Sequence, residues 1–281
     1  MSENGKPAEQ DGIDWWGEIK TIGLLALLVL FVHSFVAKPF YIPSISMMPN
    51  LLVGDRLIVS KFPYGYSWVS PSFHLFPETP GRIFGKMPER GDIVIFSPEG
   101  AQEDWIKRVI AFPGETIELR AGQIFIDGKP VPLESQPQMK IPVDPNNPCS
   151  EGSFPGALSE EGGQPVCAVN IQRETLPNSV SYDVIDARRG ENDDFGPYRV
   201  PADHVFVMGD NRDNSSDSRV AAIRGGLGGA IPWENIGGRA EIITFSLDGT
   251  AGWNPVSWFE ALRGGRAGTS LRPDHNDNKT E

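Results

Sequence analysis

The chain has 281 residues, of which 39% are hydrophobic and 22% charged, an ordinary balance for a globular protein that buries a core. Its formal net charge of −12 argues against nucleic acid as a partner, because phosphates would repel such a surface. Thirty-one glycines and 25 prolines favour turns and short strands, and therefore mainly β structure. The sequence has no zinc-type Cys/His spacing, and a histidine-based triad could draw only on His33, His74, His204 and His275.

Residues 21–37 form an apolar run, TIGLLALLVLFVHSFVA, between Lys20 and Lys38. The run is just long enough for a helix that crosses a hydrocarbon core of about 30 Å. A cleaved signal peptide fits poorly, since Phe35 would stand where the cleavage site needs a small residue. A buried core helix would show a polar stripe, which this run lacks. We therefore expect an uncleaved transmembrane anchor at 21–37 after a short tail at 1–20, although the lysines favour an inside N-terminus only weakly.

Short apolar runs between turn residues predict β-strands beyond the anchor. We expect these strands at residues 92–96, 105–111, 116–119, 123–126, 204–208 and 239–245. Residues 130–198 have few apolar runs and many Pro, Gly, Asn and acidic residues, and we interpret them as an insertion that decorates a β core. That core would comprise about 38–129 and 199–247 within a domain over 38–262. The polar residues 263–281 predict a disordered tail.

The only two cysteines, Cys149 and Cys167, both lie in this insertion. A disulfide between them would suit an oxidising compartment. Two unrelated thiols remain the alternative.

The segment Pro43–Leu51 (PSISMMPNL) places two serines, Ser44 and Ser46, between prolines just beyond the anchor. Such a constrained backbone can present a nucleophilic hydroxyl while amides point at an oxyanion. A serine-rich turn with no catalytic role gives the same pattern.

Lys107 lies in the predicted strand 105–111, on the same face as Trp105 and Val109, whereas Arg108 points to the opposite face. Burial among apolar neighbours would lower the pKa of the lysine, and a neutral amine can serve as a general base. The alternative is a lysine that extends to solvent from a half-exposed strand.

Two further motifs follow the same order along the chain. Residues 54–61 (GDRLIVSK) indicate a turn that leads into a strand, with a structural role. Residues 209–219 (GDNRDNSSDSR) contain no apolar side chain and follow an apolar strand, but their acidic spacing is not that of an EF-hand. They could form a solvated turn or a hydrogen-bonded platform for a catalytic amine.

Together these four motifs resemble the bacterial type I signal peptidase family, which uses a serine–lysine pair and a fold of antiparallel β-sheets. The resemblance implies Ser46 as nucleophile, Lys107 as general base, Ser44 in the oxyanion hole and Ser215 on the lysine amine. The supporting scaffold is matched by Asp210, Arg212, Asp217 and Arg219. The substrate groove, which takes small residues one and three places before the cut, is matched by Phe40, Ile42, Pro43, Trp105 and Ile106.

The resemblance also implies a single-pass protein of the cytoplasmic membrane with its catalytic domain outside, close to the export translocon. Its partners would be signal-peptide-bearing preproteins and the lipid bilayer, and it would need no metal or organic cofactor. The sequence departs from the family pattern at Ile45, where a small residue is common, and at Asn50, where threonine is usual. Two rivals stay open: a specialised relative that processes one pilin or conjugation substrate, and a non-catalytic membrane-tethered binding module.

Overall fold

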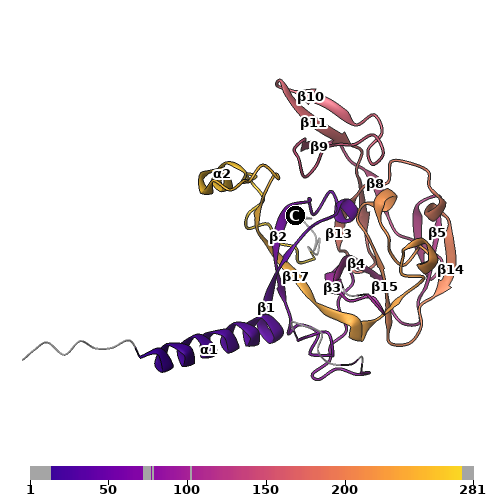
Figure 1. Cartoon of the computed structure of the whole chain (residues 1–281). Helices are drawn as coiled ribbons and strands as arrows, with labels where there is room; N and C mark the ends of the chain where they lie inside the picture. The colour runs from indigo at the N-terminus through magenta and orange to yellow at the C-terminus, as the bar shows by residue number, and fades with distance from the viewer. Residues whose placement is uncertain (1–13, 72–76, 78, 102, 274–281) are drawn as a thin grey trace, which may run out of the picture.

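A computed structural model describes residues 14–71, 77, 79–101 and 103–273. This part of the chain folds mainly into antiparallel sheets, with one long apolar helix at its N-terminal end (Figure 1). The predicted fold class is therefore confirmed.

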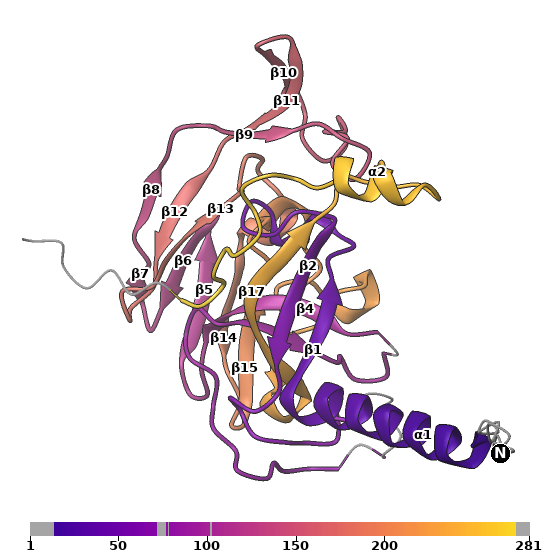
Figure 2. The same ribbon diagram turned by 90° about the vertical axis from the view of Figure 1, so that its left-hand side faces the viewer.

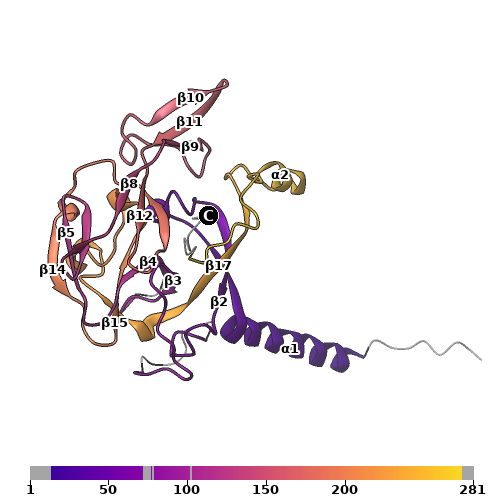
Figure 3. The same cartoon turned by 180° about the vertical axis from the view of Figure 1, so that it is seen from behind.

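The N-terminal helix α1 spans Trp15–Phe31 and continues as a π-helical turn over Val32–Val36. Asp14 caps its first turn by accepting a hydrogen bond from the Gly17 N–H at 3.1 Å. No side chain of α1 is buried, and Figures 1 and 3 show the helix projecting away from the sheets. The 22-residue segment Trp15–Val36 is long and apolar enough to cross a membrane. It begins before the predicted range 21–37 and stops just short of Ala37, the first residue of a strand.

The helix joins the sheets without a free linker, because β1 begins at the residue after the π-helical turn. The Lys61 N–H donates to the Val36 carbonyl at 2.9 Å. The Tyr66 hydroxyl donates to the Phe35 carbonyl at 2.9 Å, and the two rings lie 5.5 Å apart. These contacts fix the direction in which α1 leaves the body.

The largest sheet has seven antiparallel strands in the order β1-β2-β17-β3-β4-β15-β16. Its strands are β1 (Ala37–Tyr41), β2 (Asp55–Ser60), β3 (Ile93–Phe96), β4 (Trp105–Ala111), β15 (His204–Met208), β16 (Ile231–Pro232) and β17 (Ile236–Ser246). From Ile106 onward β4 is buried on both faces, so its side chains meet protein on either side of the sheet. The catalytic candidates come from this strand and from the loops after β1 and β15.

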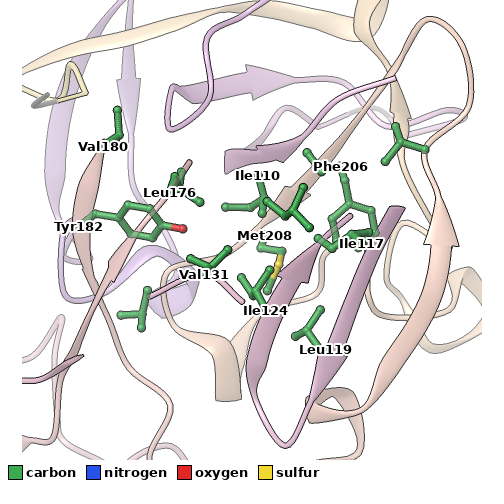
Figure 4. Close-up of a cluster of buried hydrophobic side chains, with 14 residues drawn as sticks. Ile110, Ile117, Leu119, Ile124, Val131, Leu176, Val180, Tyr182, Phe206 and Met208 are labelled. Atoms are coloured by element: carbon green, nitrogen blue, oxygen red, sulfur yellow. The ribbon is translucent and has the colours of Figure 1, made fainter. Parts of the chain in front are cut away.

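Residues 130–198 form more than a decoration of this core. They supply a three-stranded sheet, β13-β12-β8, which lies beside a four-stranded sheet, β14-β5-β6-β7 (Figure 2). The strands are β5 (Thr116–Arg120), β6 (Gln123–Ile126), β7 (Lys129–Pro130), β8 (Leu133–Ser135), β12 (Gln172–Thr175), β13 (Ser181–Val184) and β14 (Phe195–Arg199). Val131, Leu176 and Tyr182 pack in one buried cluster with Ile110 of β4 and Phe206 of β15 (Figure 4). The insertion thus completes a second hydrophobic core.

A third small sheet, β10-β11-β9, carries Cys167 in β11, and Cys149 lies in the loop between β9 and β10. Its strands are β9 (Met139–Pro142), β10 (Leu158–Glu161) and β11 (Gln164–Val169). Cys149 and Cys167 are joined in a disulfide with their Cα atoms 5.5 Å apart. Both half-cystines belong to one buried cluster with Met48 and Leu52, so the disulfide region supports the loop that carries Ser46.

The expectation of a disordered tail from 263 onward is wrong for residues 263–273, and residues 274–281 lie outside the described part. After the short helix α2 (Pro255–Glu260), the chain returns to the body. Arg263 pairs with Asp144 at 2.8 Å, Arg266 pairs with the buried Asp55, and Leu271 is buried. Arginines that pair with buried or half-buried carboxylates order this polar segment.

Candidate active site

Ser46 lies on a 3₁₀ turn, Ile45–Met47, directly after β1. The buried side chains of Met47 and Leu51 hold this turn against the core, and its Leu51 N–H donates to the Met47 carbonyl at 2.9 Å. The Ser46 carbonyl accepts a hydrogen bond from the Asn211 N–H at 3.1 Å. The loop that carries Ser46 is therefore tied by its backbone to the polar segment 209–219, as a platform would require.

Lys107 extends from β4 so that its Nζ lies 3.0 Å from Ser46 Oγ and 2.9 Å from the Ile106 carbonyl. The lysine is only 5% exposed. Burial lowers its pKa to about 8, against the opposing effect of the Asp217 and Asp210 carboxylates and with a smaller contribution from Arg219. An amine with this pKa has a substantial neutral fraction near neutral pH, as a general base requires.

The other two predicted serines flank this pair. Ser44 Oγ lies 3.2 Å from Ser46 Oγ. Ser215 is buried close to Gly209, where a side chain would collide with both Ser215 Oγ and the Ser46 carbonyl. Ser215 Oγ has no hydrogen-bond partner among the described residues, so the bond to Lys107 that the resemblance implies is not formed here. Position 209 thus needs glycine because Ser46 and Ser215 approach its backbone.

Four charged residues of segment 209–219, Asp210, Arg212, Asp217 and Arg219, form buried ion pairs. Asp217 accepts two hydrogen bonds from the Arg219 guanidinium, at 3.0 and 2.9 Å, and a third from the Gly209 N–H at 3.0 Å. Burial alone would raise the pKa of Asp217, but Arg219 and these hydrogen bonds hold it below its usual value. The arrangement is a hydrogen-bonded platform, and the solvated turn considered from the sequence is excluded.

Arg108 is a site residue that the sequence reasoning left out. It does point away from Lys107, but the opposite face of β4 is buried, and Arg108 is 4% exposed. Its guanidinium donates to Asp210 at 2.8 and 2.7 Å and lies 4.1 Å from the centre of the Tyr182 ring. Asp210 lies two residues after Met208, and Met208 of β15 is the register partner of Arg108 in β4. Had this antiparallel pairing been known, it would have predicted that Asp210 and Arg108 lie close together.

Asn50, a departure from the family pattern, has a structural role on the same carboxylate. Its side-chain amide donates at 2.7 Å to Asp210 Oδ2 and at 2.7 Å to the Asp183 carbonyl of β13. It therefore connects the loop that carries Ser46 both to segment 209–219 and to segment 130–198.

The five residues predicted to line a substrate groove do not all lie in one cluster. Phe40, Ile42 and Ile106 pack in the same apolar cluster. Trp105 packs in another, although the centre of its ring lies 5.8 Å from Lys107 Nζ. Pro43 is exposed beside Ser44. The structure thus places three of the five in one cluster, Trp105 beside Lys107, and Pro43 at the surface next to Ser44.

Comparisons of the sequence and fold with known proteins all give signal peptidases. The sequence matches the family described as signal peptidase, peptidase S26, over residues 15–245. Signal peptidase I of Rickettsia akari (strain Hartford) is 32% identical over 271 residues, covering 92% of this chain and 85% of the relative. That of Rickettsia rickettsii (strain Sheila Smith) is 33% identical, with 92% and 85% covered. The crystal structure of a signal peptidase I from Enterococcus faecalis V583 is 22% identical and covers 55% of this chain and 97% of its own, with a TM-score of 0.28.

Proposed function

The chain belongs to the signal peptidase family, peptidase S26, and we propose that it cleaves signal peptides from exported preproteins with Ser46 as nucleophile and Lys107 as general base. The observation that carries this proposal is the 3.0 Å separation of Lys107 Nζ and Ser46 Oγ within a buried site. Among the described residues, Ser46 Oγ has no histidine within hydrogen-bond distance, which favours the lysine as base.

In the acylation step, Ser46 Oγ attacks the scissile carbonyl carbon and its proton passes to the neutral Lys107 amine. The C–N bond then breaks, the departing nitrogen of the mature chain takes the proton from Lys107, and the signal peptide remains on Ser46 as an ester. Lys107, neutral again, takes a proton from water as that water attacks the ester. The proton returns to Ser46 Oγ when the ester bond breaks, so the enzyme is regenerated.

The remaining polar groups act around this pair. The Ser44 hydroxyl and the Ser46 N–H donate to the oxyanion of the tetrahedral intermediate. Ser215 Oγ, unpaired among the described residues, hydrogen-bonds the Lys107 amine only during the reaction, and Asp210, Arg212, Asp217 and Arg219 hold the segment that carries Ser215. Phe40, Ile42, Pro43, Trp105 and Ile106 contact the extended substrate around its small residues.

The apolar segment Trp15–Val36 anchors the enzyme in the lipid bilayer of the cytoplasmic membrane. Residues 1–14 lie in the cytoplasm, and the peptidase domain that begins at Ala37 lies on the outer side. This orientation places the site where signal peptides emerge, near the export translocon. The disulfide between Cys149 and Cys167 agrees with an oxidising compartment.

Cleavage of a generic preprotein by purified enzyme tests the activity, with Ser46→Ala as the decisive variant. We expect Ser46→Ala to fold normally and to lose cleavage, because the change removes one oxygen that the core does not use. Activity within about tenfold of the parent would point to another nucleophile. An inactive parent on generic preproteins, but active on one pilin-like substrate, would favour the specialised alternative.

Orientation is tested separately, by adding protease to intact spheroplasts. The domain beyond Ala37 should be degraded while a short N-terminal piece stays protected. Protection of the whole chain until lysis would reverse the proposed topology.

A further inference from the structure

A buried carboxylate from segment 130–198 faces the catalytic scaffold. Glu174 of β12 is 2% exposed, and both its oxygens pair with the guanidinium of Arg212, with Nη2 2.5 Å from Oε2. The Tyr182 hydroxyl of β13 donates to the same Oε2 at 2.7 Å. Burial and this carboxylate raise the pKa of Tyr182, so the phenol remains a donor at neutral pH. Neither residue belongs to the four motifs that carry the family resemblance.

Arg212 connects Glu174 to the reacting groups. Its Nε donates to the Gly209 carbonyl at 3.2 Å, and its own carbonyl accepts from Arg219 at 3.0 Å. Gly209 lies against Ser215 Oγ and the Ser46 carbonyl, and Arg219 pairs with Asp217. The charged groups that act on Lys107 are Asp217, Asp210 and Arg219. Arg219 and its partner Asp217 belong to this network, and the Asp210 carboxylate is held by Arg108 and Asn50.

The segment has two further contacts with the platform. The Ile185 N–H donates to the Asp210 carbonyl at 2.9 Å, and the Arg212 N–H donates to the Ile185 carbonyl at 2.8 Å. The Tyr182 ring lies under the Arg108 guanidinium that pairs with Asp210. Segment 209–219 is thus held, on the side away from Lys107, by residues of β12 and β13 and by Ile185, which follows β13.

We propose that Glu174, supported by Tyr182, is a positioning residue of the active site, which acts through Arg212 to hold segment 209–219 against Ser46 and Lys107. Segment 130–198 is on this view part of the catalytic apparatus. The inference rests on the proposed serine–lysine mechanism, because segment 209–219 bonds to the Ser46 carbonyl and its charges act on the pKa of Lys107.

The principal test is Glu174→Gln in the full-length enzyme, which keeps the shape and removes the charge. Arg212 is then left as a buried cation without its partner, and segment 209–219 loosens. We expect kcat to fall by about 10- to 100-fold, as small displacements of catalytic groups do, with a much smaller change in KM. Water that reaches Lys107 should also move the ionisation in the pH–rate profile upward, toward the ordinary lysine value.

Arg173→Gln is the matched control, because Arg173 is the preceding residue of β12 and forms a surface pair with Asp183. It should leave kcat, KM and the ionisation as in the parent. A purely structural role for Glu174 would reduce the folded fraction, measured by circular dichroism, but would not shift the ionisation of the remaining active enzyme.

Tyr182→Phe decides the matter if Glu174→Gln does not fold, since it removes only the hydroxyl. It should lower kcat by about 2- to 10-fold and shift the ionisation in the same direction. An unshifted ionisation in the folded variant, with kcat equal to that of Arg173→Gln, overturns the proposal. Lys107→Arg is assayed alongside, because turnover in that variant would disprove the serine–lysine mechanism itself, whatever Glu174 does.

Discussion

Two buried lysines in the large sheet have the same lowered pKa but different surroundings. Lys107 on β4 and Lys61 at the end of β2 are both almost fully buried, and burial lowers the pKa of each to about 8. Lys107 Nζ lies 3.0 Å from the Ser46 hydroxyl. The groups that affect the pKa of Lys61, besides its burial, are the charges of Lys38, Asp104 and Arg82. Burial therefore lowers the pKa of a lysine enough for it to act as a base. It can do so in catalysis only where a hydroxyl that can attack the substrate lies within hydrogen-bond distance.

The largest effect should separate the two lysines by activity. Lys107→Met and Lys107→Arg should both reduce kcat by about 10²- to 10⁴-fold, because methionine has no base and arginine does not deprotonate. Lys61→Met should retain activity within about twofold of the parent. Preprotein cleavage at pH 8 measures all three, and equal losses at both positions would remove the distinction.

The pH dependence of the cleavage rate should reflect the ionisation of Lys107 and not that of Lys61. If neutral Lys107 is the base, as we propose, the rate should rise about tenfold per pH unit below its pKa of about 8 and level off above it. Lys61→Met should leave this profile unchanged. If the ionisation disappears with Lys61→Met, the assignment of the base is wrong.

A smaller loss is expected at Arg108. The sequence places this residue on the face opposite Lys107, where Arg108→Lys would keep most activity, but the structure buries that face and pairs Arg108 with Asp210. Lysine keeps the charge but cannot form the two-point contact with Asp210. We expect about a tenfold loss of kcat and about 1–3 kcal/mol of lost stability. Kinetics and thermal unfolding measure the two effects, and parental values in both would show that the contact is dispensable.

The smallest effect concerns the stability of folding and should favour the variant. The pKa of Lys61 is about 8 in the fold against 10.5 normally, so the unfolded chain binds more protons between these values. Stability therefore rises with pH through this window, and below it the buried ammonium costs at most about 3 kcal/mol. Lys61→Met should be more stable at pH 7 by about 1–3 kcal/mol, with a flatter pH dependence. Denaturant unfolding at pH 7 and pH 10 measures the difference.

Local sequence patterns predicted the strands well and the covering layers poorly. The strands at 105–111, 123–126 and 204–208 have the predicted bounds, because alternation and turn residues mark them locally. The pattern also placed Lys107 and Arg108 on opposite faces. It could not show that both faces are buried, since the residues that cover Arg108 lie about 75–100 positions away, in β13 and after β15.

The strands and the core residues of segment 130–198 could not be predicted from the sequence, for a related reason. Its strands are short, and its core residues, such as Val131, Leu176 and Tyr182, are spread among turns, so no apolar run is visible. The partnership of Glu174 with Arg212 joins residues that the chain separates widely, and charge alone does not indicate which acidic residue is buried. Residues 263–273 show the same limit, because a polar composition does not reveal ion pairs with the body.

The rigid joint between α1 and β1 has a consequence for how the enzyme meets its substrate. With α1 across the bilayer, Ser46 follows Ala37 by only nine residues, which span at most about 30 Å even when extended. The Lys61 N–H bond to the Val36 carbonyl and the Tyr66 hydroxyl bond to the Phe35 carbonyl hold the start of this segment against the sheets. If α1 spans the bilayer and Ser46 is the nucleophile, as we propose, the site lies at a fixed distance from the lipid surface. A preprotein whose cleavage site lies at another height has to move through the membrane to meet it.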